Sequence, residues 1–163
     1  MSLRLTQASD YAILAMIHMA CLPENSVALR AQIVKSCDIP PSFAAKILRS
    51  LVRAGLLQST RGARGGFRLA RPASEISVLD IIESTEGPLA LARCVEAPCS
   101  CEMAEECPVQ PVWVGVQAKL AEVLRGEILE DLVSAPRRRA AVLVPVTAVG
   151  ALAPARKPGP PRR

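Results

Sequence analysis

The chain has 163 residues, about half of them apolar, and carries a formal charge of +5 from 20 basic and 15 acidic side chains. This length allows one compact domain with an appendage, and one Trp, one Tyr and two Phe among many aliphatic residues predict an aliphatic, mainly helical core. The single histidine, His18, lies in an apolar stretch, which argues against a histidine-based catalytic site and for a protein that is not an enzyme.

The charge is distributed unevenly along the chain. Residues 30–71 contain nine Lys or Arg and a single acid, whereas residues 75–131 contain twelve acids and three bases. A basic segment followed by an acidic one is typical of a protein whose first part binds nucleic acid and whose second part has a different function. Residues 135–163 carry seven bases, no acid and many prolines, so we predict a disordered tail there.

The N-terminus and the cysteines indicate the compartment. The first ten residues lack the apolar run of a secretory signal, and no apolar stretch is long enough to span a bilayer. We therefore expect a cytoplasmic protein without a membrane partner. Four of the six cysteines cluster within fourteen residues, and in a reducing compartment such a cluster favours metal over disulfides. The clustered cysteines are Cys94, Cys99, Cys101 and Cys107.

The first two predicted elements are helices. Residues 5–21 are apolar on nearly all sides, which is typical of a helix buried between neighbours, with Thr6 as its N-cap and Pro23 beyond its end. A second helix is expected over residues 28–36, and the chain then turns through residues 37–41.

A third helix, beginning at Ser42 and ended by Gly55, separates apolar from basic side chains. The residues expected to point inward are Ala44, Ile47, Leu48 and Leu51. The opposite face carries a basic stripe of Lys46, Arg49 and Arg53. The stripe predicts a helix that enters the major groove of DNA.

Two strand-like runs, LLQST and FRLARP, flank the basic loop RGARGG and predict a hairpin. Helix, helix, turn, basic helix and basic hairpin form the layout of a winged helix-turn-helix, in which Arg61 and Arg64 of the wing reach the DNA backbone or minor groove. The alternative is that these arginines only solvate the hairpin. The side chains expected to face the groove are Ser42, Phe43, Ala45, Lys46 and Arg49.

The second half of the chain predicts a short helix, a loop and a long helix. Ser77 begins a capping-box-like helix that Gly87 ends, and the cysteine segment follows as a loop. Residues 112–127 then form a helix whose apolar stripe suits a partner helix, although packing onto its own domain is the alternative. The residues expected at the dimer interface are Trp113, Val116, Leu120 and Val123.

The predicted fold is therefore mainly α. A winged helix-turn-helix with a two-stranded wing occupies residues 1–72. The cysteine-rich loop and the long dimerisation helix occupy residues 73–134, and the tail occupies residues 135–163.

Several segments together resemble the Rrf-type regulators, the family of IscR, NsrR and RirA, and most of all the members that regulate the Suf iron–sulfur assembly system. The matching segments, in collinear order over about residues 3–134, are RLTQASDYAI, AGLL, RGARGGFRLARP, EISVLDIIESTEGPLAL and CPVQPVW. The resemblance implies a homodimeric winged-helix transcription factor that binds a promoter operator. It also implies that three loop cysteines of each subunit hold an iron–sulfur cluster, here Cys94, Cys101 and Cys107.

The fourth ligand departs from the IscR pattern. IscR has a histidine three residues after the last cysteine, whereas this chain has Gln110, a poor iron ligand. In NsrR-like members an aspartate at the start of the first helix is the ligand, and Asp10 occupies the matching position. Asp10 could instead be an acid favoured by the helix dipole, and Cys99 is a competing ligand. The cluster type, [2Fe-2S] or [4Fe-4S], stays open.

The resemblance implies a DNA-binding iron–sulfur sensor, acting as a repressor that responds to iron–sulfur status, iron, or nitric oxide and redox stress. Thiolates also suit zinc, so a regulator that holds zinc or no metal and senses thiol oxidation is the first alternative. The second alternative is a small cluster carrier or electron-transfer protein. Such a protein would have no use for the basic helix and wing.

Overall fold

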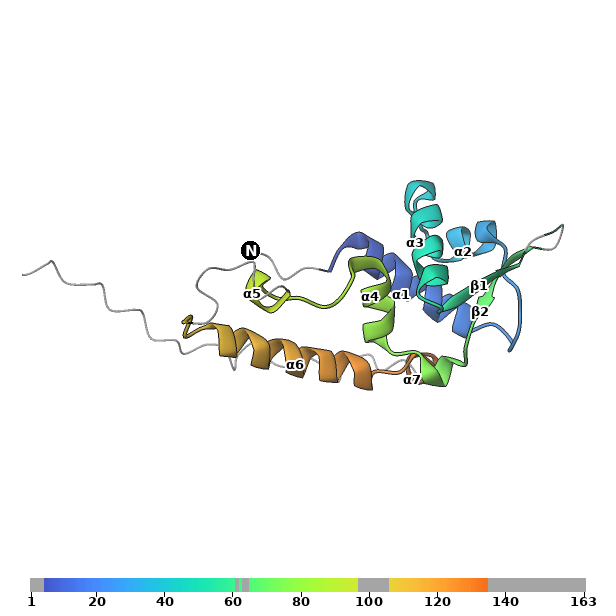
Figure 1. Ribbon diagram of the computed structural model, residues 1–163. Helices are drawn as coiled ribbons and strands as arrows, with labels where there is room; N and C mark the ends of the chain where they lie inside the picture. Colours follow the sequence, from blue (N-terminus) through green and yellow to red (C-terminus); the bar gives the residue numbers. More distant parts are fainter. Residues whose placement is uncertain (1–4, 61, 63–64, 97–105, 135–163) are drawn as a thin grey trace, which may run out of the picture.

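The computed structural model describes residues 5–60, 62, 65–96 and 106–134 (Figure 1). These residues form a mainly helical protein with one two-stranded antiparallel sheet, as predicted. The elements are α1 (Gln7–Ala20), α2 (Arg30–Ser36), α3 (Pro41–Arg53), β1 (Leu57–Thr60), β2 (Gly66–Leu69), the 3-10 turn η1 (Ala73–Glu75), α4 (Val78–Glu86), α5 (Arg93–Glu96), α6 (Gln110–Gly126) and α7 (Leu129–Ser134).

Helix α1 is the central helix and is surrounded by other elements. It contacts α2, α3, α4 and α7, which explains why its sequence is apolar on nearly all sides. Ala12, Ala15, Met16 and Met19 are buried in the main hydrophobic cluster. Thr6 is the N-cap residue, as predicted, but its hydroxyl makes no capping bond within the helix.

Helix α3 has the two faces that its periodicity predicts. Its four expected inward residues, Ala44, Ile47, Leu48 and Leu51, are all buried. Gly55, at φ +71°, ends the helix, since the amides of Gly55 and Leu56 donate to the carbonyls of Val52 and Leu51. Glycine tolerates this left-handed backbone at little cost, and the chain can turn directly into β1.

The hairpin pairs Leu57 with Leu69 at its base and Thr60 with Gly66 near its tip. Ala28 adds an isolated bridge to Phe67, so the segment before α2 lies along the open edge of β2. A Cβ atom on Gly66 would lie 2.5 Å from the Ala28 carbonyl oxygen, which explains why the position is a glycine.

Helix α4 begins with the predicted capping box. The Ser77 hydroxyl accepts a hydrogen bond from the Asp80 amide at 3.1 Å, and the Asp80 carboxylate accepts one from the Ser77 amide at 3.0 Å. The same carboxylate pairs with Arg71 at 3.0 Å. Gly87, at φ +84°, follows the helix as predicted.

Two elements of the second half differ from the sequence-based expectation. The cysteine segment was expected to be loop, but its first residues form the single helical turn α5. A separate helix, α7, follows α6 and buries Leu129 in the main cluster, where an isolated bridge joins Ile128 to Ser77. The main cluster therefore joins residues on both sides of position 72.

Helix α6 projects away from this cluster (Figure 1). It contacts α4 and α5, yet none of its residues is buried. Within the described part of the chain, no helix combines the length and the apolar character needed to cross a bilayer.

Candidate functional site

The predicted DNA-reading face lies on the outer side of α3. Ser42, Lys46 and Arg49 are exposed there, and Ala45 is half-buried. The Arg49 Nε donates a hydrogen bond of 3.1 Å to the Ala45 carbonyl oxygen, which directs the guanidinium along the helix surface. Arg53 is exposed one turn further on. The face therefore presents three exposed cationic side chains, an arrangement that suits a polyanion such as DNA.

Phe43 departs from the expectation for this face. Its side chain is half-buried, packs against the main cluster, and holds its ring 5.7 Å from the ring of Tyr11 at 59°. Phe43 therefore fastens the first turn of α3 to α1 and is not free to reach into a groove. The periodicity of α3 alone does not reveal this, because Tyr11 belongs to a different helix.

The wing is described at its base, whereas Arg61 and Arg64 lie outside the described residues. The Thr60 hydroxyl accepts a hydrogen bond of 3.1 Å from the Gly66 amide and closes the hairpin below the tip. On the strands, Arg68 donates from Nε and a terminal nitrogen to the Gln58 side-chain oxygen at 3.0 and 2.8 Å. Arg68 is thus a further cation held on the wing, which the sequence analysis did not single out.

A cluster around Glu86 joins the N-terminus of α1 to the end of α4, and no pattern in the sequence indicates it. We call Glu86, Thr6 and Ser9 the Glu86 clamp. The Glu86 carboxylate, at the end of α4, accepts hydrogen bonds from the Thr6 amide at 3.2 Å, the Thr6 hydroxyl and the hydroxyl of the fully buried Ser9. It thereby satisfies donors at the N-terminus of α1.

The charge state of Glu86 follows from these contacts. Burial raises the pKa of the carboxyl, but the hydrogen bonds from Ser9 and Thr6 and the positive charge of Lys46 together outweigh burial. The pKa of Glu86 therefore lies below its ordinary value, and the group is anionic at neutral pH. Lys46 lies on the exposed basic face of α3, and its charge is the smallest of the causes that lower this pKa.

Two of the three predicted cysteine ligands lie within the described residues. Cys94 is on α5 and Cys107 precedes α6, and both are half-buried free thiols. Helix α5 contacts α6, and Cys107 lies three residues before α6 begins. The chain between α4 and α5 is also tied down, since the Leu91 amide donates to the Gln117 side chain of α6 at 3.0 Å. Cys99 and Cys101 lie outside the described residues.

The predicted fourth ligand, Asp10, lies in the first turn of α1 and is exposed. Among the described residues, no three His, Cys, Asp or Glu side chains are grouped closely enough to hold a metal ion. Asp10, Cys94 and Cys107 of one chain therefore do not form a metal site by themselves. Gln110, where IscR has its histidine, is the first residue of α6.

The remaining two cysteines are separate from this region. Cys21 is exposed at the end of α1. Cys37 lies beside α1, where its thiol donates to the Leu14 carbonyl oxygen at 3.5 Å. Burial raises the pKa of the Cys37 thiol, which keeps it protonated and poorly reactive.

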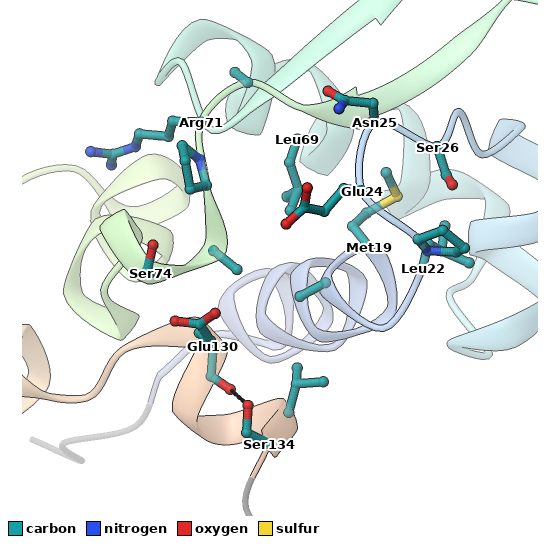
Figure 2. Close-up of a pocket in the computed structure, with 16 residues that line it drawn as sticks. Met19, Leu22, Glu24, Asn25, Ser26, Leu69, Arg71, Ser74, Glu130 and Ser134 are labelled. Carbon is teal, nitrogen blue, oxygen red and sulfur yellow. Dashed lines mark hydrogen bonds between the residues drawn. The ribbon is translucent and has the colours of Figure 1, made fainter.

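A cleft of about 470 Å³ opens at the C-terminal end of α1 (Figure 2). The end of α1, the following turn, the end of β2, η1 and α7 line it. Figure 2 shows Arg71 directed away from Glu130, consistent with its pairing to Asp80. None of the described residues that line the cleft is a cysteine or histidine, so the cleft adds no donor to the cysteine region.

The predicted dimer stripe of α6 is largely exposed in one chain. Val123 is 61 % exposed, Val116 44 % and Trp113 37 %. Leu120 is half-buried on a helix that contacts α4. The stripe is therefore split between residues that face solvent and a residue shielded by its own chain.

Comparisons with known proteins agree on one family. The family model Rrf2, described as iron-dependent transcriptional regulator, matches residues 5–135. Protein aau3 of Rhizobium meliloti (strain 1021) is 35 % identical over 134 residues, which cover 82 % of this chain and 86 % of that protein.

Two solved structures extend the comparison. CymR, the global cysteine regulator of B. subtilis, is 27 % identical with a TM-score of 0.65, covering 82 % of this chain and 98 % of CymR. IscR of T. potens is 27 % identical with a TM-score of 0.63, covering 86 % of this chain and 93 % of IscR. Together with the winged helix-turn-helix and its basic face, these matches establish that the chain belongs to the Rrf2 family of transcriptional regulators.

Proposed function

We propose that this regulator binds a promoter operator in duplex DNA through α3 and the wing and acts as a repressor. The observation that carries the proposal is the exposed cationic face of α3, where Lys46, Arg49 and Arg53 lie opposite the buried apolar face. Arg61 and Arg64 are assigned to the wing contacts with phosphate or the minor groove.

The second part of the proposal is a homodimer built on α6. A helix without any buried residue gains little from its own fold, and a contiguous apolar stripe favours association with a second copy. Trp113, Val116 and Val123 are the exposed contributors, and Leu120 is assigned to the edge of this interface. Two-fold symmetry then places two recognition helices on two half-sites of the operator.

The third part is an iron–sulfur cluster held by Cys94, Cys101 and Cys107. The donor chemistry fits, because half-buried, unpaired thiols are the soft ligands that such clusters take. The position of the two cysteines is compatible with this assignment, since Cys94 lies on α5, which contacts α6, and Cys107 lies three residues before α6 begins. A bound cluster would supply sensitivity to iron, oxygen or nitric oxide, and the protein would supply the DNA-reading surface.

Asp10 is assigned as the fourth ligand, and Cys99 is the competitor. Since Asp10 is not grouped with the cysteines of its own chain, the proposal needs residues 97–105, a second subunit, or both to complete the set. Asp10→Ala is expected to alter the visible spectrum and shorten the life of the cluster in air. Cys99→Ala is expected to change neither property.

The test is anaerobic purification followed by an absorbance spectrum and analysis of iron and sulfide. The wild type is expected to be coloured and to contain both elements, and Cys94→Ala, Cys101→Ala and Cys107→Ala are each expected to be colourless. Cys21→Ala is the matched control. Cys21 follows the C-terminal end of α1, whereas Asp10 lies in the first turn of α1, so this variant should keep the chromophore. A colourless wild type with one zinc per subunit would contradict the cluster assignment.

The similarity to CymR favours a second candidate, a regulator that senses thiol oxidation with zinc or no metal. CymR is described as a global cysteine regulator, and the match with this chain covers 98 % of the CymR chain. The same purification separates the two candidates. A metal-free protein whose DNA affinity changes on mild oxidation, and whose response is lost in Cys94→Ala or Cys107→Ala, would support the thiol sensor.

A further inference from the structure

A second cleft, of about 300 Å³, lies between α1 and α2 and differs in charge from the cleft in Figure 2. Leu22 and Ser26, at the right of Figure 2, line both clefts, so the turn after α1 separates them. The first cleft carries the carboxylates of Glu24 and Glu130, whereas none of the described residues that line the second cleft is an acid. An anionic ligand would therefore be repelled from the first cleft and not from the second.

The polar side chains of the second cleft can all donate hydrogen bonds. Lys35 of α2 is exposed and forms no ion pair within the part of the chain that the structure describes. His18 of α1 is half-buried and can donate a ring N–H. The Gln32 side-chain oxygen already accepts the Leu29 amide at 2.7 Å, which leaves the amide group of Gln32 as a donor. One charge and several donors suit an anionic acceptor such as a carboxylate.

The other walls of the second cleft are apolar. Leu22, Val27 and Ala28 form them. Val27 is 42 % exposed, so a ligand with an apolar body would remove this side chain from water, whereas a purely polar anion would not. The volume is at the small end of the range for ligand clefts, which suits a compact molecule.

The apolar wall of this cleft rests on the wing. The backbone of the buried residue Ala28 exchanges two hydrogen bonds of 2.9 Å with Phe67 of β2. A Cβ atom on Gly66 would lie 2.8 Å from the Val27 Cγ1, so Val27 packs directly against β2 at that residue. A ligand in the cleft would therefore touch residues that support the wing, together with the helix that precedes α3.

We propose that the cleft between α1 and α2 binds a small organic carboxylate with a compact apolar body. Lys35 supplies the positive charge, and His18 and Gln32 supply hydrogen bonds to the carboxylate. Val27 and Leu22 contact the apolar body. Binding of this ligand requires neither DNA nor a bound cluster.

The chain contains its own probe of this cleft. His18 is the only histidine, so the ring protons of one residue report on the site without overlap. The experiment titrates the untagged full-length protein at fixed pH and follows the His18 ring signal by proton NMR. The ligands are benzoate, its neutral analogue benzamide, and acetate, which has the charge without the ring. Benzoate is expected to shift the signal to saturation with a dissociation constant below about 1 mM, and the other two to bind at least roughly tenfold more weakly.

Two variants separate the contributions of charge and apolar contact. Lys35→Gln is expected to weaken benzoate binding roughly three- to tenfold and to leave benzamide unchanged, because only the charged ligand uses the ammonium group. Val27→Ala is expected to weaken benzoate binding and to leave acetate unchanged, because acetate has no ring to cover Val27. Lys119→Gln, on α6, is the matched control and should bind benzoate like the wild type. Circular dichroism verifies that each variant is folded.

Several results would overturn the proposal. A benzoate titration without saturation up to about 10 mM would show that the cleft is no site for such an acid. Benzamide that binds as tightly as benzoate, or an unchanged affinity in Lys35→Gln, would remove the role of the anion. Inorganic phosphate that saturates the signal at a lower concentration than benzoate would assign the cleft to a phosphate group instead. Operator binding is measured separately with duplex DNA, so its failure and the failure of this proposal are distinguishable.

Discussion

The unit around α1 and the projecting helix α6 are stabilised in different ways. The first unit buries a continuous cluster to which α1, α2, α3, the hairpin, α4 and α7 all contribute. Helix α6 is longer than any other described helix and buries none of its residues. The comparison teaches that the unit around α1 completes its own core within one chain, whereas α6 leaves an apolar stripe exposed, which is why we assign the proposed dimer interface to it.

The largest effect is expected from a cavity in the first unit. Leu51→Ala removes a fully buried side chain from the cluster and is expected to lower the free energy of unfolding by about 2–5 kcal/mol. Urea unfolding followed by circular dichroism measures the loss. The matched change on α6, Val123→Ala, should cost less than about 0.5 kcal/mol in dilute protein. Equal losses at both sites would contradict the contrast between the two regions.

The next effect concerns the association of α6. Val116→Glu places a charge on the exposed part of the stripe, one turn before Leu120, and is expected to weaken the dimer by about 2 kcal/mol or more. Analytical ultracentrifugation over a concentration series measures the shift to monomer. Lys119→Glu, on the same helix, should leave the dimer intact. An unchanged dimer in Val116→Glu would place the interface on another element.

A smaller effect is expected at the reading face. Lys46→Ala and Arg49→Ala should each weaken binding to a duplex that the wild type selects from a random library by about 1–3 kcal/mol if the side chain contacts a base edge. Lys119→Ala removes an equal charge from α6 and should have little effect, because the proposed DNA contacts lie on α3 and the wing and not on α6. Arg64→Ala should lower affinity evenly across sequences and flatten the salt dependence, which titration at several salt concentrations would reveal.

The smallest effect is the pH dependence contributed by Glu86. Its pKa in the folded protein is lowered, so its stabilisation is complete above the pKa of the unfolded chain and is lost as the pH falls through the folded value. The stability difference between wild type and Glu86→Gln should therefore be present at pH 7 and shrink towards pH 3. Unfolding curves at several pH values measure it. Glu83→Gln is the control, and a difference that grows in acid would contradict the assigned direction.

Local signals in the sequence determined a large part of the fold. The alternation of apolar and basic side chains along α3 sets which face is buried, because helical geometry repeats within one turn. Gly55 and the Ser77 capping box mark helix ends through contacts between residues at most five positions apart. The hairpin follows from two short strands around a glycine-rich loop. For these elements, the residues that signal the structure also make the contacts that stabilise it, and they lie within one short segment of the chain.

Part of the candidate site could also be anticipated from the sequence. The basic stripe of α3 is exposed where its periodicity places it, and the apolar stripe of α6 leaves Val116 and Val123 exposed. The assignment of Cys94, Cys101 and Cys107 rests on resemblance and spacing, because a thiol can serve several metals or none. Their role stays a prediction.

Only the tertiary structure decided the remaining features, and each depends on residues far apart in the chain. Thr6 and Glu86 are 80 positions apart, and no local pattern predicts that the carboxylate of one helix binds the N-terminus of another. Phe43 turned out to pack on Tyr11, and α7 returns to the cluster beside Ser77. Periodicity tells which face of a helix is buried, but the partner of that face is chosen by how all the helices pack together, since burial is non-directional and many pairings satisfy the same local pattern.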